Sequence, residues 1–163
     1  MRSLLTRFRA ASLAAALVVT PAVAITAAPV AAHASTHKTP ARLKALAYAK
    51  RQLGDPYVFG AAGPDAFDFS GLTMRAYDDA GVSIGGHSAT AQYRTARAKH
   101  QLRSVKSVRK GDLLFYGSTH DVYHVAMYVG GGKMIEAADY GIPVRIVKMR
   151  KGHLLSKVAD PKG

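Results

Sequence analysis

Hydrophobic residues recur along this chain with two different periods. From residue 41 to residue 99 they return every three or four positions, the spacing that places them on one face of an α-helix. This pattern predicts three helices, over residues 41–53, 69–80 and 89–99. Residues that favour helix ends bound these segments: Pro40, Asp68 and Ser88 at the starts, and Gly54 and Gly81 beyond two of the ends.

From residue 112 onward the hydrophobic period shortens to two, which is typical of strands. Residues 122–129 alternate, which places His124 and Ala126 on the same face of one strand. Apolar runs predict further strands over residues 113–116, 134–138 and 144–149. The connections are short, and short connections join antiparallel strands. The order of elements therefore predicts an α+β fold, with N-terminal helices packed on an antiparallel sheet.

The N-terminus has the pattern of a secretory signal peptide. Residues 1–9 carry three arginines and no acid, an apolar run follows over residues 10–19, and Ala32-His33-Ala34 fits a small-x-small cleavage site. We therefore expect residues 1–34 to be removed, leaving no transmembrane span. An uncleaved anchor is the alternative, although the apolar run is shorter than the ~20 residues that span a membrane.

The rest of the chain suits one domain of ordinary size. We expect a short linker over residues 35–40, a domain over residues 41–150 and a partly ordered basic tail over residues 151–163. The sequence contains no cysteine, so no disulfide supports the domain, and it must be stabilised by its hydrophobic core.

Basic residues outnumber acidic ones by 23 to 10 in the whole chain, and residues 1–34 hold three of the basic residues. The remaining chain carries a formal charge of +10, which favours contact with polyanions. Residues 80–111 contain seven lysines and arginines and no acid, which suggests a docking face for an anionic polymer or simply a solvated surface. Tyr93 is the single Phe, Tyr or Trp in this segment, so aromatic residues do not interleave with the basic ones, and no nucleic-acid motif is present. We therefore expect no nucleic-acid partner.

A turn-rich loop leads into the second predicted helix. Residues 60–72 read Gly-Ala-Ala-Gly-Pro-Asp-Ala-Phe-Asp-Phe-Ser-Gly-Leu, in which glycines and proline predict a loop and Asp68 predicts a helix cap. A cysteine at position 69 would lie at the positive end of the helix dipole, where a thiolate is stabilised. This chain has Phe69 there instead.

Four motifs, in order, resemble those of the NlpC/P60 family. They are Pro-Tyr-Val-Phe-Gly at 56–60, Phe-Asp-Phe-Ser-Gly-Leu at 67–72, Gly-Asp-Leu-Leu-Phe-Tyr at 111–116 and His-Val-Ala-Met-Tyr-Val-Gly at 124–130. The family consists of papain-like cysteine peptidases that cut the peptide stems of bacterial cell wall. The resemblance therefore implies a papain-like NlpC/P60 fold. Family members read Asp-Cys-Ser-Gly, so the resemblance implies that Phe69 stands in the slot of the catalytic cysteine.

The same resemblance places His124 in the slot of the catalytic histidine and Glu136 in the slot of the third residue, which orients the imidazole. The two residues share a sheet face if the glycine turn at 130–132 leaves an odd number of residues unpaired. A carboxylate beside an imidazole fixes its tautomer and favours imidazolium. Without the resemblance, His124 reads as an ordinary polar residue on a half-exposed strand.

No residue replaces the missing nucleophile in an obvious way. Ser70 is rotated by about 100° around the helix from position 69, so it should point away from the imidazole, and its alkoxide is harder to form than a thiolate. The resemblance implies that the Tyr57 hydroxyl lies near the site. It would bind ligand but is a poor nucleophile, because its ordinary pKa is about 10. The Phe69 ring either fills the cleft or offers an apolar surface to a ligand.

Asp68 and Ser70 flank Phe69, and in the family these positions help to hold the substrate peptide. Both residue types are also favoured at helix starts without any function. A metal site is not expected, because His120 and His124 would lie about 13 Å apart on an extended strand. We expect no cofactor either, since the glycine turn lacks the other residues of a phosphate-binding loop.

Two functions follow from this pattern. The first is a secreted, extracellular domain at the bacterial cell wall that is catalytically silent. Such a domain would bind peptidoglycan stem peptide or anionic wall polymer, or regulate an active cell-wall hydrolase. The alternative is a peptidoglycan endopeptidase with a non-cysteine nucleophile, which the retained His124 and Glu136 keep open.

Overall fold

The computed structural model describes residues 38–162. The expected signal peptide over residues 1–34 lies outside the described residues, as does half of the expected linker. Within the described part, no helix is both long and apolar enough to cross a membrane.

The three helices predicted from the hydrophobic period are present as α1 (Ala41–Arg51), α2 (Phe69–Asp79) and α3 (Ala89–Ala98). The Asp68 carboxylate accepts a hydrogen bond from the backbone N–H of Gly71 at 2.7 Å and so caps α2 as expected. Ser88 caps α3 in the same way. Pro40 occupies the cap position of α1, where no side chain accepts a hydrogen bond.

In the described part of the chain, six strands form one antiparallel sheet in the order β1-β6-β2-β3-β4-β5. They are β1 (Leu102–Ser104), β2 (Leu113–Gly117), β3 (Val122–Gly130), β4 (Lys133–Glu136), β5 (Arg145–Lys148) and β6 (Lys157–Ala159). A 3-10 turn, η1 (Val105–Ser107), follows β1. The four predicted strands correspond to β2 through β5, which pair in sequence order. Strands β1 and β6 have three residues each, too few for an alternating pattern to reveal them.

The expectation of a partly ordered basic tail over residues 151–163 is wrong. The backbone N–H of Leu155 donates to the carbonyl of Phe115, and β6 then inserts between β1 and β2. Val158 and Ala159 are completely buried. The domain therefore continues beyond residue 150, because β6 supplies the hydrogen bonds that join β1 to the rest of the sheet.

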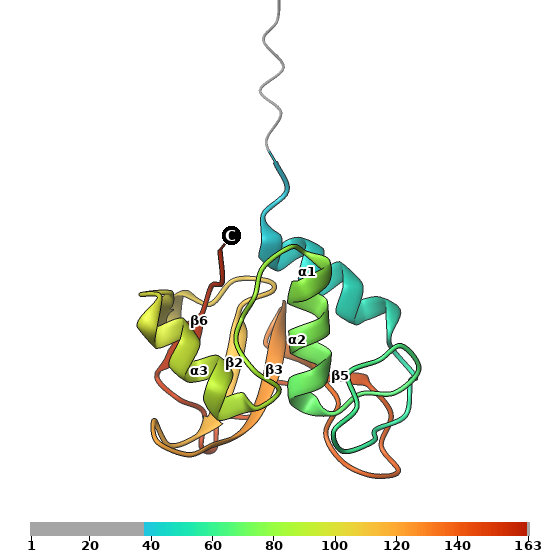
Figure 1. Ribbon diagram of the computed structural model, residues 1–163. Helices are drawn as coiled ribbons and strands as arrows, with labels where there is room; N and C mark the ends of the chain where they lie inside the picture. Colours follow the sequence, from blue (N-terminus) through green and yellow to red (C-terminus); the bar gives the residue numbers. More distant parts are fainter. Residues whose placement is uncertain (1–37, 163) are drawn as a thin grey trace, which may run out of the picture. The chain divides into compact units, whose positions relative to one another are not determined.

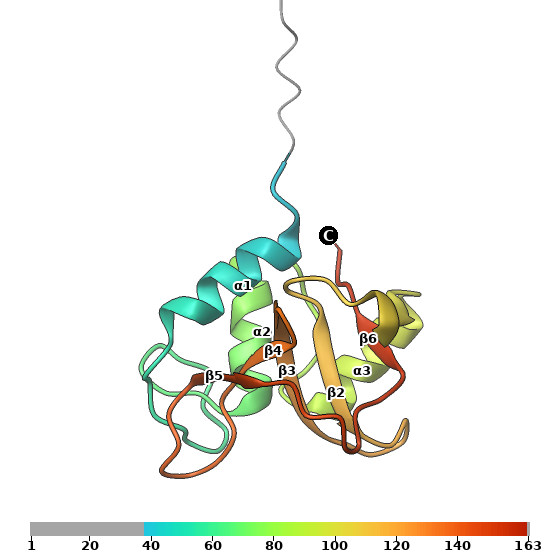
Figure 2. The same ribbon diagram turned by 180° about the vertical axis from the view of Figure 1, so that it is seen from behind.

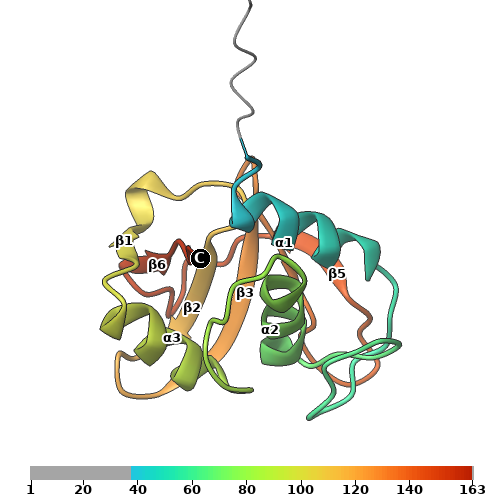
Figure 3. The same ribbon diagram turned by 45° about the horizontal axis from the view of Figure 1, so that its top comes forward.

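The helices cover one face of the sheet, and α1 lies against α2 (Figure 1). The larger core fills the space between these layers, and it includes Tyr77, Phe115 and Val125. A second core, around Tyr116 and Met134, lies on the other face, which Figure 2 shows from behind. Residues 125–129 of β3 alternate between the two cores, as the sequence predicted. Val122 departs from the predicted alternation and joins the larger core, because the β2–β3 register shifts where it pairs with Gly117. The sheet is thus buried on both sides, and α2 rests on β3 (Figure 3).

Candidate functional site

The first residue of α2 faces the middle of the sheet. Phe69 is half-buried, and its ring centroid lies 5.3 Å from that of His124 on β3, with an angle of 59° between the ring planes. The Asp68 cap determines where α2 begins, and α2 packs on β3. This packing of the helix on the strand brings Phe69 and His124 together although they are far apart in the sequence. An aromatic ring therefore occupies the space in front of the imidazole.

His124 and Glu136 form the pair that the sequence predicted. Met127 on β3 pairs with Ile135 on β4, so Glu136 follows on the same sheet face as His124, diagonally across the hairpin. Nε2 of His124 lies 3.0 Å from Oε2 of Glu136. Glu136 is fully buried and His124 is only 7% exposed. The carboxylate thus holds one ring nitrogen and fixes the plane of the imidazole.

Two arginines that the sequence reasoning missed also bind Glu136. Arg150 makes a bidentate contact, with Nη2 at 2.7 Å from Oε2 and Nη1 at 3.0 Å from Oε1. Nη2 of Arg145 lies 3.4 Å from Oε1. Arg145 stands directly opposite Glu136 in the β4–β5 pairing, so a cross-strand search for charge partners would have found it.

The charge state of Glu136 follows from these contacts. Burial alone raises the pKa of Glu136, but the hydrogen bonds from His124 and Arg150 and the charge of Arg150 outweigh it and lower the pKa to about 2. The hydrogen bond to Glu136 in turn raises the pKa of Arg150. Glu136 is therefore an ionised carboxylate whose charge is shared among three partners, rather than dedicated to His124.

Asp68 holds together the loop that leads into α2. Its Oδ1 accepts from the N–H of Gly71, from the Ser70 hydroxyl at 3.0 Å and from Nε2 of His87 at 2.9 Å, and its Oδ2 accepts from the N–H of Gly60 at 2.9 Å. Burial raises the pKa of Asp68, but the hydrogen bonds from Gly71, His87 and Gly60 outweigh it and lower the pKa. His87 was not among the predicted residues, and the spacing of 19 residues gave no signal for this pair.

Ser70 is not directed at the imidazole. Its hydroxyl donates to Asp68, its carbonyl accepts from Nε2 of Gln92 at 2.8 Å, and the residue is only 2% exposed. The geometry agrees with the expectation that Ser70 points away from His124. A Ser70–His124–Glu136 triad would need the Ser70 side chain to give up its bond to Asp68.

Tyr57 lies in the same loop region and is largely buried. Its ring packs edge-on against Tyr140, with the ring centroids 5.1 Å apart. Burial, and after it the negative charge of Asp68, raises the pKa of the Tyr57 hydroxyl. The hydroxyl therefore stays protonated at neutral pH and can donate a hydrogen bond.

Within residues 38–162, no group of three histidines, cysteines or carboxylates is placed to hold a metal ion. His120 and Asp121, which the sequence singled out together with His124, are both exposed, whereas His124 is buried. The structure does not bring the three side chains into one cluster.

Comparison with family models matches residues 54–160 to the NlpC/P60 family. The chain belongs to this family. Probable endopeptidase p60 of Listeria grayi is 42% identical over 98 residues, 60% of this chain and 18% of that protein. Protein P54 of Enterococcus faecium is 40% identical over 102 residues, 62% of this chain and 19% of that protein. The chain thus spans about a fifth of the length of these NlpC/P60 relatives.

Solved structures agree with this assignment. The peptidoglycan hydrolase RipB of Mycobacterium tuberculosis is 30% identical with a TM-score of 0.63, covering 73% of this chain and 63% of that one. RipD of the same organism, described as a non-catalytic NlpC/p60 domain protein adapted to peptidoglycan binding, is 27% identical with a TM-score of 0.63, covering 75% and 98%. These matches confirm the predicted α+β NlpC/P60 fold. The chain is a peptidoglycan hydrolase-like NlpC/P60 domain.

Proposed function

We propose that this NlpC/P60 domain is catalytically silent and binds the stem peptide of peptidoglycan. The observation that carries the proposal is the Phe69 ring in front of His124, at the helix start where the family places its cysteine. A phenyl ring has no lone pair to attack a carbonyl and no proton to transfer to the imidazole. The chain contains no cysteine at any other position.

Several features around Phe69 suit a ligand. Phe69 is half-buried, so part of its ring is open to an apolar side chain. Tyr57 supplies a protonated hydroxyl, whereas Asp68 and Ser70 have most of their hydrogen-bonding capacity committed inside the loop. We therefore assign contact with the ligand to Phe69 and Tyr57, and assign to Asp68 and Ser70 the role of shaping the loop.

The relative RipD supports a binding role, since its description joins this fold to peptidoglycan binding without catalysis. We further propose that the protein acts outside the cell, at the wall, because residues 1–34 have the pattern of a signal peptide. An active cell-wall hydrolase is a partner that such a domain would regulate by occupying the same stem peptides.

The second candidate is a peptidoglycan endopeptidase with a non-cysteine nucleophile. The intact contact between His124 and Glu136, at 3.0 Å, favours it, because a base and its orienting group are both in place. Its weakness is the position of Ser70, whose hydroxyl is bound to Asp68.

Incubation of the purified protein with peptidoglycan and with a soluble stem peptide separates the two functions. When stem peptide is added, we expect the NMR signals of Phe69 and His124 to shift and those of the exposed His100 to stay at the same chemical shift. We also expect the protein to release no fragments from peptidoglycan. Fragment release that is lost in His124→Ala and retained in His100→Ala would establish the hydrolase instead. Unchanged signals at Phe69 and His124 would contradict the binding proposal.

A further inference from the structure

Two hollows meet around Asp160, near the C-terminal end of the described chain. One, of about 450 Å³, lies beside the start of α1, and the other, of about 460 Å³, lies beside β1. Arg109, Asp160 and Lys162 line both hollows, so the two form one continuous surface. Neither hollow is lined by Phe69 or His124, so this surface is separate from the site around those two residues.

The surface is strongly basic. Besides the residues that line both hollows, the first is lined by Lys38, Arg42 and Lys44, and the second by Lys99 and Arg103. Asp160 is the only carboxylate that lines either hollow. Asp112 lies behind the surface, fully buried, with Oδ2 at 3.8 Å from Nη1 of Arg103. The positive charge therefore exceeds the negative charge by a wide margin even when both carboxylates are ionised.

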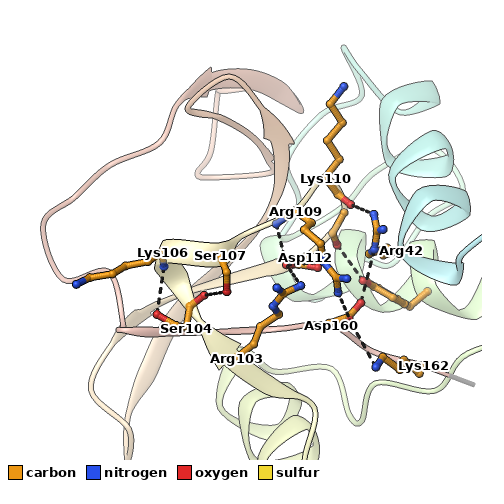
Figure 4. Close-up of polar contacts among 12 residues, drawn as sticks. Arg42, Arg103, Ser104, Lys106, Ser107, Arg109, Lys110, Asp112, Asp160 and Lys162 are labelled. Atoms are coloured by element: carbon orange, nitrogen blue, oxygen red, sulfur yellow. Dashed lines mark hydrogen bonds and ion pairs between the residues drawn. The ribbon is translucent and has the colours of Figure 1, made fainter.

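Asp160 organises the cations rather than neutralising the surface. Its carboxylate contacts Nε of Arg42 at 3.7 Å, Nζ of Lys162 at 3.7 Å and Nη2 of Arg109 (Figure 4). Its side chain is only 11% exposed, whereas that of Lys162 is 74% exposed. A ligand in the hollows would therefore meet the cations before it met the carboxylate. Arg42 is held further by a bond to the carbonyl of Lys110.

We propose that this basic surface binds a linear polyphosphodiester of the wall teichoic type, laid across both hollows. Arginine and lysine are the side chains that recognise phosphate. The uncapped start of α1, which has no acid in its first turn, adds backbone N–H groups at the edge of the first hollow. Placement at the wall rests on the proposed function, but binding to the polymer does not.

Two other polyanions fit the surface less well. No Phe, Tyr or Trp lines either hollow, and the imidazole of His100 in the second hollow is the one aromatic ring available for a nucleic-acid base to stack on. The large exposed hydrophobic residues of the described chain lie elsewhere, so nothing at this surface would insert into a lipid membrane. The lining is built for a flexible polyanion that offers phosphates alone.

The test measures binding of purified poly(glycerol phosphate) to the whole protein and to a variant with Lys44→Gln and Lys162→Gln. We expect the variant to bind roughly 25-fold more weakly, about fivefold for each lysine. The slope of log affinity against log salt should fall by about 1.5 units, because each lost phosphate contact contributes about 0.7–0.9. The matched control is Lys50→Gln with Lys151→Gln, which removes the same charge from exposed lysines outside both hollows and should bind like the unmodified protein.

A third substitution tests whether the polymer crosses both hollows. Adding Lys99→Gln should weaken binding again, because Lys99 lines only the second hollow. Equal weakening by the control pair, or no weakening by Lys44→Gln with Lys162→Gln, would overturn the proposal. So would single-stranded DNA or anionic vesicles that bind as tightly as the polymer. Soluble stem peptide should bind the variant and the unmodified protein alike, so failure of the stem-peptide proposal would be seen separately.

Discussion

Under the proposed function, residue 69 is the position at which this domain differs chemically from a cysteine peptidase. Its position at the start of α2 combines the positive end of a helix dipole with an adjacent imidazole, which are the two features that lower the pKa of a thiol. The surroundings of a nucleophile are therefore present without a nucleophile. We infer that the loss of chemistry is confined to one side chain.

Restoring a thiol at this position tests that inference. In Phe69→Cys the chain has one cysteine, so alkylation by iodoacetamide reports that site alone. We expect the pH midpoint of alkylation to lie below the ordinary thiol pKa of about 8.5, and to rise when His124→Ala is added. Phe59→Cys, on an exposed loop, is the control and should titrate near the ordinary value. Equal midpoints for the two thiols would show that the site has lost more than its nucleophile.

Glu136 gives a second prediction at the residue scale. Because its contacts with His124 and Arg150 lower its pKa from 4.5 to about 2, its contribution to stability is complete above pH 4.5 and is lost as the pH falls toward 2. Glu136→Gln should remove this part of the acid dependence. At neutral pH it should also lower the free energy of unfolding by roughly 2 kcal/mol, since the arginines that lose their partner are partly exposed.

Urea unfolding at several pH values measures both effects. The unfolding free energy of the unmodified protein should fall more steeply below pH 4.5 than that of Glu136→Gln. Asp65→Asn, at an exposed carboxylate without an ion pair in the described chain, should keep the steep dependence. Parallel curves for the unmodified protein and Glu136→Gln would argue against the low pKa.

At the scale of elements, α2 and the loop before it approach each other closely at Gly71. A side chain on Gly71 would place its Cβ 2.1 Å from the carbonyl oxygen of Ala61 and 2.9 Å from Nε2 of His87. Backbone cannot move aside as a flexible side chain can. The glycine of the Ser-Gly motif is therefore needed for packing, apart from any role in chemistry.

Gly71→Ala should destabilise the protein by about 1–3 kcal/mol, the usual range for overpacking. Replacing glycine by alanine within a helix usually raises the free energy of unfolding by up to about 1 kcal/mol, so the change expected here has the opposite sign. Thermal unfolding measures the change. Gly152→Ala is the control, because a Cβ there meets nothing within 4 Å. An unchanged or raised melting temperature for Gly71→Ala would contradict the close approach.

At the scale of the whole molecule, the sheet is completed by the last strand. β6 lies between β1 and β2, so these two strands are joined only through it. The same C-terminal segment carries Asp160 and Lys162 into the basic surface and Arg150 onto Glu136. The end of the described chain therefore contributes to the fold, to the candidate functional site and to the proposed polymer site.

A chain that stops after residue 150 should fail to fold, whereas one that stops after residue 161 should fold. The shorter chain loses the strand that pairs with β1 and β2, and it exposes the core around Tyr116. Circular dichroism and a cooperative thermal transition distinguish the outcomes. A cooperative transition for the shorter chain would show that β6 is dispensable.

The sequence alone was sufficient for the helices, for four strands and for the family, because each rests on local patterns. Hydrophobic period reports which side of a helix or strand is buried, and helix caps act within a few residues, as Asp68 does on Gly71. The pairing of His124 with Glu136 was also within reach, because a hairpin turn relates the two positions. These inferences needed no knowledge of how distant segments meet.

Only the tertiary structure decided which distant side chains meet. Arg150 reaches Glu136 across 14 residues, His87 reaches Asp68 across 19, and Arg109 reaches Asp160 across 51. The pairing of β6 with β2 is likewise a contact between segments that are distant in the sequence, so only the tertiary structure shows it. A periodic pattern records how deeply a residue is buried but not against what, since the partner is set by the path of the whole backbone.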